Sequence, residues 1–182
     1  MPRYVALLRA INVGGHIVKM DQLRKLFTQL GFTDVETFIA SGNVLFTSPS
    51  KSTAALEKKI EKHLEAALGY EVATFVRTAA EVCQAAAHEP FSAAVMKAPY
   101  HGVYVSFLRE APGAAAKRAV EALRSDNDEF HINARELYWL SRLPFSETKI
   151  GGALLEKTVG MPATMRSVTS LRKLAAKCGD PK

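Results

Sequence analysis

The sequence contains few of the residue patterns on which catalytic and metal sites are usually built. Its 182 residues include only two cysteines, Cys83 and Cys178, which are far apart in the chain and show no CxxC spacing. We interpret both as reduced thiols, because structural disulfides are rare in cytoplasmic proteins. The five histidines show neither an HExxH motif nor paired ligand spacing, so the sequence predicts no metal site.

Long apolar runs are missing as well. No stretch approaches the roughly 20 apolar residues that span a bilayer, and the short apolar segment 4–8 carries no cleavage site of a signal peptide. GxGxxG, Walker and GxSxG motifs are absent, so no cofactor, nucleophile or general base can be named. The sequence therefore predicts a cytoplasmic globular protein without membrane association, and it leaves open both enzymatic activity and oligomeric state.

The positive charge is concentrated at the two ends of the chain. The net charge is +6, with +4 in residues 1–31, +5 in residues 142–182 and −3 between them. If the fold brings the ends together, they form a surface that attracts anions. The alternative is that lysine-rich, solvated helix faces happen to occur there.

A hexapeptide that occurs nearly twice gives the strongest indication of the fold. YVALLR spans 4–9 and YVSFLR spans 104–109, and each reads as a buried strand followed by a turn and an amphipathic helix. In the first half the pattern predicts strand, helix, a hairpin of two strands around a Ser-Gly-Asn turn, helix and strand. This βαββαβ order is ferredoxin-like.

The second half repeats that order with one weak element. A strand from 103, a helix after a Pro-Gly turn, a hairpin and a short helix are followed by a weak edge strand at 161–164 and a final helix. Residues 90–102 read as an irregular crossover, because prolines interrupt any period. We therefore predict an α+β fold of two ferredoxin-like subdomains related by a pseudo-repeat, 1–90 and 91–182, the second with a C-terminal helix.

The loop after the first strand is the strongest candidate for function. Glycines between a strand and a helix allow backbone N–H groups to point at an anion, and the helix N-terminus adds a favourable dipole. The run RAINVGG places Gly14 and Gly15 there, close to Arg9 and Asn12. The structural alternative is that the glycines form only a turn.

Several runs of the sequence match a known pattern. VALLRAINVGG, LGF at 30–32 and SGNVLF at 41–46, together with TKI at 148–150 and PAT at 162–164, resemble the bacterial domain-of-unknown-function 1697 family. The resemblance covers essentially the whole chain and implies two ferredoxin-like subdomains, but no activity. The chain departs from the family pattern at Ala10, usually Gly, at Ser167-Val168, usually Asn-Trp, and at Gly151-Gly152, where the family has a more helix-favouring start.

These observations lead to one site hypothesis. Arginine offers a bidentate fork for phosphate or carboxylate, and Asn, Ser and glycine N–H groups offer neutral hydrogen bonds. We predict that an anionic small molecule, such as a nucleotide or phosphorylated metabolite, binds where the loop meets the C-terminal segment. The predicted ligand-binding residues are Arg9, Asn12, Gly14, Gly15, Ser41, Asn43, Lys149 and Arg166. Each has a structural alternative, since Arg9 can pair with an acid and asparagines often bond to the backbone of their own turns.

Nucleic-acid binding through the basic ends of the chain is the alternative function. Phe38, Phe46 and Phe75 would stack bases if they lay on an open sheet face, and would be core residues if that face were covered. Other groups carry less information. Glu57 and Glu61 are expected on an exposed helix face among lysines, and Cys83 is expected to be a small packed residue.

Overall fold

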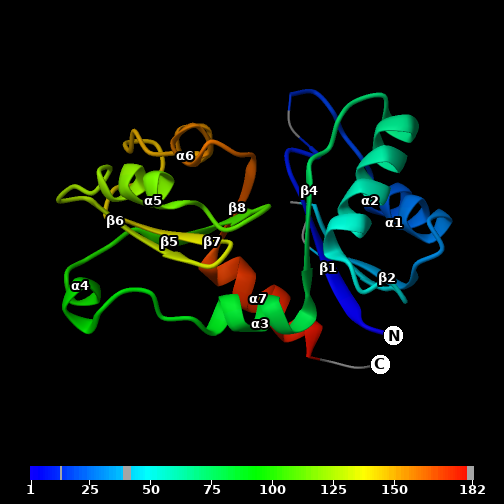
Figure 1. The fold of residues 1–182 in the computed structure, drawn as a ribbon, viewed down its shortest axis with the longest axis horizontal. Coiled ribbons are helices and arrows are strands. Elements are labelled where there is room, and N and C mark those ends of the chain that lie inside the picture. The colour runs from blue at the N-terminus through cyan, green and yellow to red at the C-terminus, as the bar shows by residue number, and fades with distance from the viewer. Residues whose placement is uncertain (13, 39–41, 180–182) are drawn as a thin grey trace. The chain divides into compact units, whose positions relative to one another are not determined.

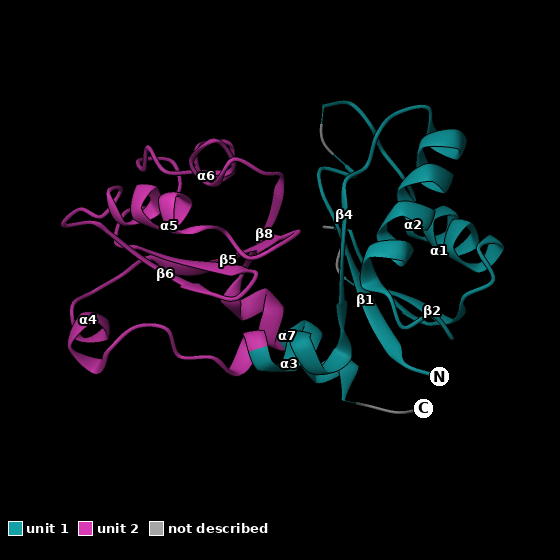
Figure 2. Ribbon diagram, viewed as in Figure 1, with its two compact units in different colours: residues 1–84, 173–182 teal, residues 85–172 magenta. Residues whose placement is uncertain are grey.

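The chain folds into two units, each built around one sheet. The structure is a computed structural model that describes residues 1–12, 14–38 and 42–179, and in this part of the chain it has two four-stranded antiparallel sheets and seven helices (Figure 1). Figure 2 shows the two compact units: unit 1 comprises 1–84 and 173–182, and unit 2 comprises 85–172. The α+β class is thus confirmed. The domain bounds 1–90 and 91–182 stay a prediction, and the units differ from them chiefly in assigning 173–182 to unit 1.

Unit 1 alternates strands and helices in the predicted order. Its sheet has the strand order β2-β3-β1-β4, and all neighbouring strands are antiparallel. The last residues of the C-terminal helix α7 also belong to this unit. Its elements are β1 (Arg3–Leu8), α1 (Met20–Gln29), β2 (Thr33–Phe38), β3 (Asn43–Thr47), α2 (Thr53–Leu68), β4 (Thr74–Thr78) and most of α3 (Ala79–Ala87).

Unit 2 repeats this topology with the strand order β6-β7-β5-β8. The predicted irregular crossover contains one short helix, capped by Ser92, which accepts a hydrogen bond from the N–H of Val95 at 3.3 Å. Helical periodicity cannot show in so short a segment between prolines. The elements are α4 (Ala93–Lys97), β5 (Gly102–Leu108), α5 (Ala114–Glu121), β6 (Asp128–Asn133), β7 (Glu136–Ser141), α6 (Gly152–Val159), β8 (Ala163–Ser167) and α7 (Val168–Cys178).

The repeated hexapeptide occupies the same position in both sheets. Tyr4 in β1 lies opposite Phe46 and Thr78, and Tyr104 in β5 lies opposite Trp139 and Ser167. In each sheet this strand is central and pairs with the second strand of the hairpin on one side and with an edge strand on the other. The predicted weak strand is therefore a full edge strand, β8, equivalent in register to β4.

The helices of unit 1 cover one face of its sheet, and every second residue of the strands points to them. Tyr4, Ala6 and Leu8 of β1 point to the same side, with Phe46 and Val76 beside them, and join the leucines of α1 and α2 in one buried cluster. The aromatic rings of this face lie in contact, with 4.4 Å between the ring centroids of Phe32 and Phe46. In unit 2 the equivalent cluster contains Leu108, Leu137 and Trp139 under α5 and α6.

Glutamate carboxylates from the covering helices accept hydrogen bonds from backbone N–H groups of the edge strands. Glu57 Oε1 accepts the N–H of Val76 at 2.9 Å, and Glu61 Oε1 accepts the N–H of Thr74 at 2.9 Å. The expectation that these two residues form a solvated face was therefore wrong, since Glu57 is only 5% exposed. Glu156 of α6 bonds to the N–H of Ala163 in the same way, also at 2.9 Å. Edge strands present unpaired backbone groups, and in both units a helix carboxylate that is buried or half-buried pairs with some of them.

Candidate functional site

The loop between β1 and α1 is exposed and differs between the two units. In unit 1 it runs from Arg9 to Lys19, whereas the equivalent loop of unit 2 occupies only 109–113. Residues 14–17 are exposed. Gly14 and Gly15 form a hydrogen-bonded turn that closes on the N–H of His16, and the N–H groups of Gly14, Gly15 and Ile17 have no acceptor within the described residues. Both glycines adopt positive φ, 67° at Gly14 and 85° at Gly15. Among the described residues, the longer loop therefore presents backbone N–H groups to solvent a few residues before α1 begins.

The rest of the loop is held in place by specific contacts. Asn12 Oδ1 accepts the N–H of Val18 at 2.8 Å, which closes the loop on itself. Tyr70 donates its hydroxyl hydrogen to the carbonyl of Ile11 at 3.2 Å, and its ring stacks on His16 with 3.9 Å between centroids. Ile11 is buried and anchors the loop in the core. Asn12 thus has the structural role that the sequence left open, and the exposed glycines are carried on a fixed base.

Ala10 adopts a left-handed backbone conformation at the start of this loop. Its φ is 54°, in a region that costs an L-residue with a Cβ about 1–2 kcal/mol. The position is the one where the resembling family usually has glycine, and the backbone geometry gives the reason. The chain keeps the conformation although its residue does not favour it.

Replacing Ala10 with glycine is expected to stabilise the protein. Relief of the left-handed strain exceeds the extra entropy that glycine gives the unfolded chain, so Ala10→Gly should raise the free energy of unfolding by roughly 0.5–1 kcal/mol. Urea titration measures this as a higher midpoint with an unchanged slope. The control is Ala54→Gly in α2, where helical φ makes glycine unfavourable and the midpoint should fall. A fall for Ala10→Gly as well would contradict the strain argument.

Gly42 and Asn43, at the start of β3, make contacts near the base of the same loop. The carbonyl of Gly42 accepts the N–H of Leu8 at 2.8 Å, and Asn43 donates its side-chain N–H to the carbonyl of Phe38 at 3.0 Å. Asn43 is 2% exposed, so its side chain closes the hairpin and is not available at the surface. Ser41, predicted beside it, lies outside the described residues.

The two predicted site residues of the C-terminal segment lie in unit 2. Lys149 is exposed on the loop before α6, and Arg166 is buried in β8. The guanidinium of Arg166 donates to Thr164 Oγ1 at 2.7 Å and to the carbonyl of Met165 at 2.9 Å, and burial lowers the pKa of Arg166 to about 10. Since these residues and the glycine loop belong to different units, their proximity stays a prediction.

Arg166 has a counterpart in unit 1 that the sequence did not single out. Arg77 lies opposite Val5 in β4, just as Arg166 lies opposite Val105 in β8. It is 1% exposed, and it donates to the carbonyl of the preceding residue at 3.2 Å, as Arg166 does at 2.9 Å. Because the two arginines occupy the same register position in the two sheets, a structural role is favoured for both. The equivalence is visible only from the strand pairing.

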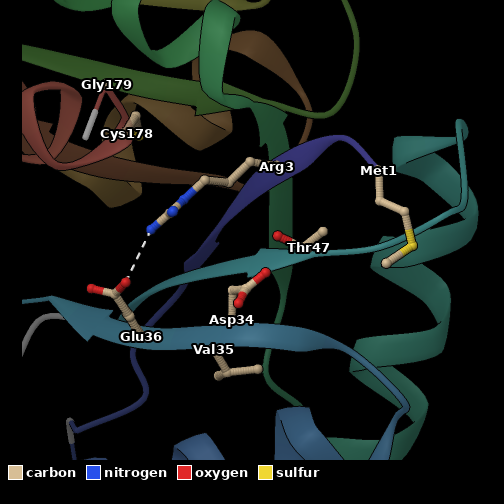
Figure 3. Close-up of a pocket in the computed structure, with 8 residues that line it drawn as sticks. All are labelled: Met1, Arg3, Asp34, Val35, Glu36, Thr47, Cys178 and Gly179. Atoms are coloured by element: carbon tan, nitrogen blue, oxygen red, sulfur yellow. Dashed lines mark hydrogen bonds and ion pairs between the residues drawn. The ribbon is translucent and has the colours of Figure 1, made fainter. Parts of the chain in front are cut away.

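A cavity of about 860 Å³ lies in unit 1 among groups that the sequence did not indicate (Figure 3). Arg3 and Glu36 form an ion pair at 3.2 Å on its wall, and Lys177 reaches the other carboxylate oxygen of Glu36 at 3.8 Å. Cys178 of α7 also lines the cavity. The charges on this wall largely neutralise one another, so the cavity shows no preference for an anion.

Three further observations concern metals, nucleic-acid bases and membranes. No group of three or more His, Cys, Asp or Glu side chains is placed to hold a metal ion among the residues that were described. Phe46 and Phe75 are completely buried, so these two rings cannot stack bases. In the described ranges, no helix combines the length and the apolar character needed to cross a membrane.

The topology and the glycine loop define a two-sheet α+β protein with one enlarged strand-to-helix loop. The chain belongs to the family described as "Protein of unknown function (DUF1697)", which matches residues 1–138. Among solved structures, the chain is similar to the conserved bacterial protein SP0830 from Streptococcus pneumoniae, with 24% sequence identity and a TM-score of 0.75 over 99% of each chain. This likeness concerns the fold alone. A comparison with curated proteins produced no match.

Proposed function

We propose that the loop of residues 9–19 binds the anionic group of a small molecule, such as a nucleotide or a phosphorylated metabolite. The observation that carries the proposal is the exposed segment 14–17, in which the N–H groups of Gly14, Gly15 and Ile17 have no acceptor within the described residues. Arg9 and Lys19 are exposed at the two ends of the loop and add positive charge. Backbone donors of a glycine-rich turn, with cations beside them, are an arrangement that proteins use for anions such as phosphate.

The difference between the two units supports this proposal. β1 and β5 occupy equivalent positions, but the loop at 9–19 is enlarged and that at 109–113 is short. The short version is enough to connect a strand to a helix. In unit 1, Ile11 and Val18 of the loop are buried in the core, whereas the exposed Gly14, Gly15 and Ile17 have no evident role in the fold. Long exposed loops on a rigid scaffold commonly carry binding functions.

The proposed site is smaller than the one predicted from the sequence. Asn12 supports the loop, and Asn43 closes the neighbouring hairpin, so neither is assigned to the ligand. A contribution from Lys149 and Arg166 stays a prediction. The proposal therefore rests on Arg9, Gly14, Gly15 and Lys19.

Removing the arginine should weaken ligand binding without unfolding the protein. Thermal unfolding is followed with inorganic phosphate, ribose 5-phosphate, AMP and ATP, since a ligand that binds the native state raises the midpoint. Loss of a charged hydrogen bond of about 1.5–3 kcal/mol should make Arg9→Ala bind roughly ten- to a hundredfold more weakly. The matched control is Arg109→Ala, at the equivalent strand end beside the short loop, which should leave the ligand-induced shift unchanged.

A second pair of variants separates binding from backbone strain. Gly15→Ala and Gly69→Ala both place a Cβ on a residue with positive φ, 85° and 81°, and in both cases the added atom meets nothing within 4 Å. Both should lose a similar amount of stability, about 1–2 kcal/mol. Only Gly15→Ala should reduce the ligand-induced shift. An equal loss of the shift in both variants, or no shift with any of the four ligands, would reject the proposal.

Nucleic acid is the other ligand class that the charge distribution allows. Its binding depends steeply on salt, because neutralised phosphates release counterions, whereas one phosphate group gives a shallow dependence. Tight binding of oligonucleotides with a steep salt slope, and no effect of the small phosphates, would favour that alternative.

We also infer that each unit is ferredoxin-like and that the two arose by duplication in a cytoplasmic protein. The strand orders β2-β3-β1-β4 and β6-β7-β5-β8 with βαββαβ connections support the first inference. The equivalent registers and the matched carboxylates Glu61 and Glu156 support the second. The cytoplasmic location remains a prediction from the sequence.

A further inference from the structure

The only two cysteines in the sequence lie on neighbouring helix segments of unit 1. Cys83 of α3 donates its S–H to the carbonyl of Ala175 of α7, with 3.7 Å between Sγ and O. Cys178 follows Ala175 by three residues, so the two lie on the same side of α7. Figure 1 shows α3 and α7 side by side. Residues that are 95 positions apart in the numbering are thus brought together by folding.

The two thiols differ in environment. Cys83 is exposed, which corrects the expectation that it is a packed residue, whereas Cys178 is partly buried and lines the cavity beside Arg3. Burial, and then the neighbouring Cys83, raise the pKa of Cys178 to about 11. Cys178 therefore remains a protonated thiol at neutral pH, and Cys83 is the thiol that a dissolved oxidant meets first.

We propose that Cys83 and Cys178 form a reversible disulfide when the protein meets a peroxide. In the first step the Cys83 thiolate attacks hydrogen peroxide, the O–O bond breaks, and a sulfenic acid and hydroxide are formed. In the second step the Cys178 sulfur attacks the Cys83 sulfur, the S–O bond breaks, and the thiol proton leaves with the hydroxyl group as water. Each sulfur loses one electron, and one molecule of hydrogen peroxide gains both electrons and is reduced to hydroxide and water.

The disulfide would join the two helices through which the chain passes between its units. The chain leaves unit 1 within α3 and returns to it within α7. A bond between them closes a long loop of the unfolded chain and so removes more unfolded-state freedom than a short one. The oxidised protein should therefore unfold at a temperature higher by roughly 5–15 °C, and a reductant should reverse the shift.

The test uses the full chain in its native state. The reduced protein is treated with hydrogen peroxide, quenched with acid, labelled with a maleimide and compared with an untreated sample by intact mass. The expected result is loss of both labels, loss of the mass of two hydrogen atoms, and a non-reduced peptide that joins the segments around Cys83 and Cys178. Dithiothreitol should restore both labels.

Two single variants assign the roles. In Cys178→Ser, Cys83 should stop at the sulfenic acid, which dimedone traps, and oxidise further with excess peroxide. In Cys83→Ser, Cys178 should keep its thiol under the same treatment. The proposal is overturned if wild-type Cys83 passes to the sulfinic acid while Cys178 stays labelled, or if the cross-links found join separate molecules. A cross-link that leaves the unfolding temperature unchanged would overturn the stabilising role.

Discussion

Gly42→Ala is expected to be among the most damaging single substitutions in unit 1. A Cβ at this position would lie 2.7 Å from Cγ2 of Ile11 and 3.1 Å from Cβ of Leu8, closer than packed carbon atoms approach. The φ of Gly42 is also 81°, which alone costs about 1–2 kcal/mol for alanine. Overpacking adds about 1–3 kcal/mol, so the free energy of unfolding should fall by roughly 2–5 kcal/mol.

Urea unfolding followed by circular dichroism measures this loss, and a matched glycine isolates the packing term. Gly31 has a φ of 84° but open space around its added Cβ, so Gly31→Ala should lose only the backbone term. Ile11 lies within the proposed anion loop and Leu8 directly precedes it, so Gly42→Ala should also weaken any ligand-induced shift. An equal loss of unfolding free energy in the two variants would show that the residues around Gly42 accommodate the added Cβ and that Ile11 does not fix the loop.

Glu57→Ala should cost nearly as much, through a different mechanism. The carboxylate accepts the N–H of Val76 at 2.9 Å in a buried environment. Truncation removes a charge-assisted hydrogen bond and leaves a buried backbone donor unpaired, which together are worth about 2–4 kcal/mol. The strand affected is β4, an edge strand, so hydrogen exchange of its amides should accelerate more than exchange elsewhere in the sheet.

Two substitutions on the same helix serve as controls for this result. Glu57→Gln keeps an acceptor of the same shape and should lose about half as much stability, because the bond is no longer charge-assisted. Glu65→Ala removes an exposed carboxylate about two turns further along α2 and should stay within about 0.5 kcal/mol of the wild type. A Glu57→Ala protein as stable as Glu65→Ala would mean that water replaces the carboxylate on β4.

Local sequence patterns predicted most elements because their causes are local. Leucine and isoleucine at four-residue spacing, a serine before the helix and Gly69 after it predict α2, which spans Thr53–Leu68. Ser52 accepts the N–H of Ala55 at 3.2 Å, and Gly69 adopts a φ of 81°. The repeated hexapeptide similarly predicted two equivalent central strands, which the strand registers bear out.

The candidate loop was predictable in part. The pair Gly14-Gly15 between a strand and a helix marks an exposed turn in any sequence, and so do the basic residues near it. The contacts that hold the loop in place were not predictable, because Tyr70 and Gly42 contact Ile11 from distant parts of the chain. The role of Asn12 was open for the same reason, since an asparagine suits a ligand and a turn equally well until its acceptor is known.

Apart from the short helix α4, the sequence by itself determined the order of strands and helices and the exposed glycine turn, because periodicity, capping and turn chemistry act over a few residues. Only the tertiary structure decided which charged groups are buried. Glu57 and Glu65 occupy similar places in the pattern of α2, yet one bonds to an edge strand and the other faces water. Cys83 and Cys178 likewise become neighbours only through the packing of α3 and α7. Such contacts depend on which helices and strands pack together. That packing is determined by the whole core and not by the neighbouring residues in the sequence.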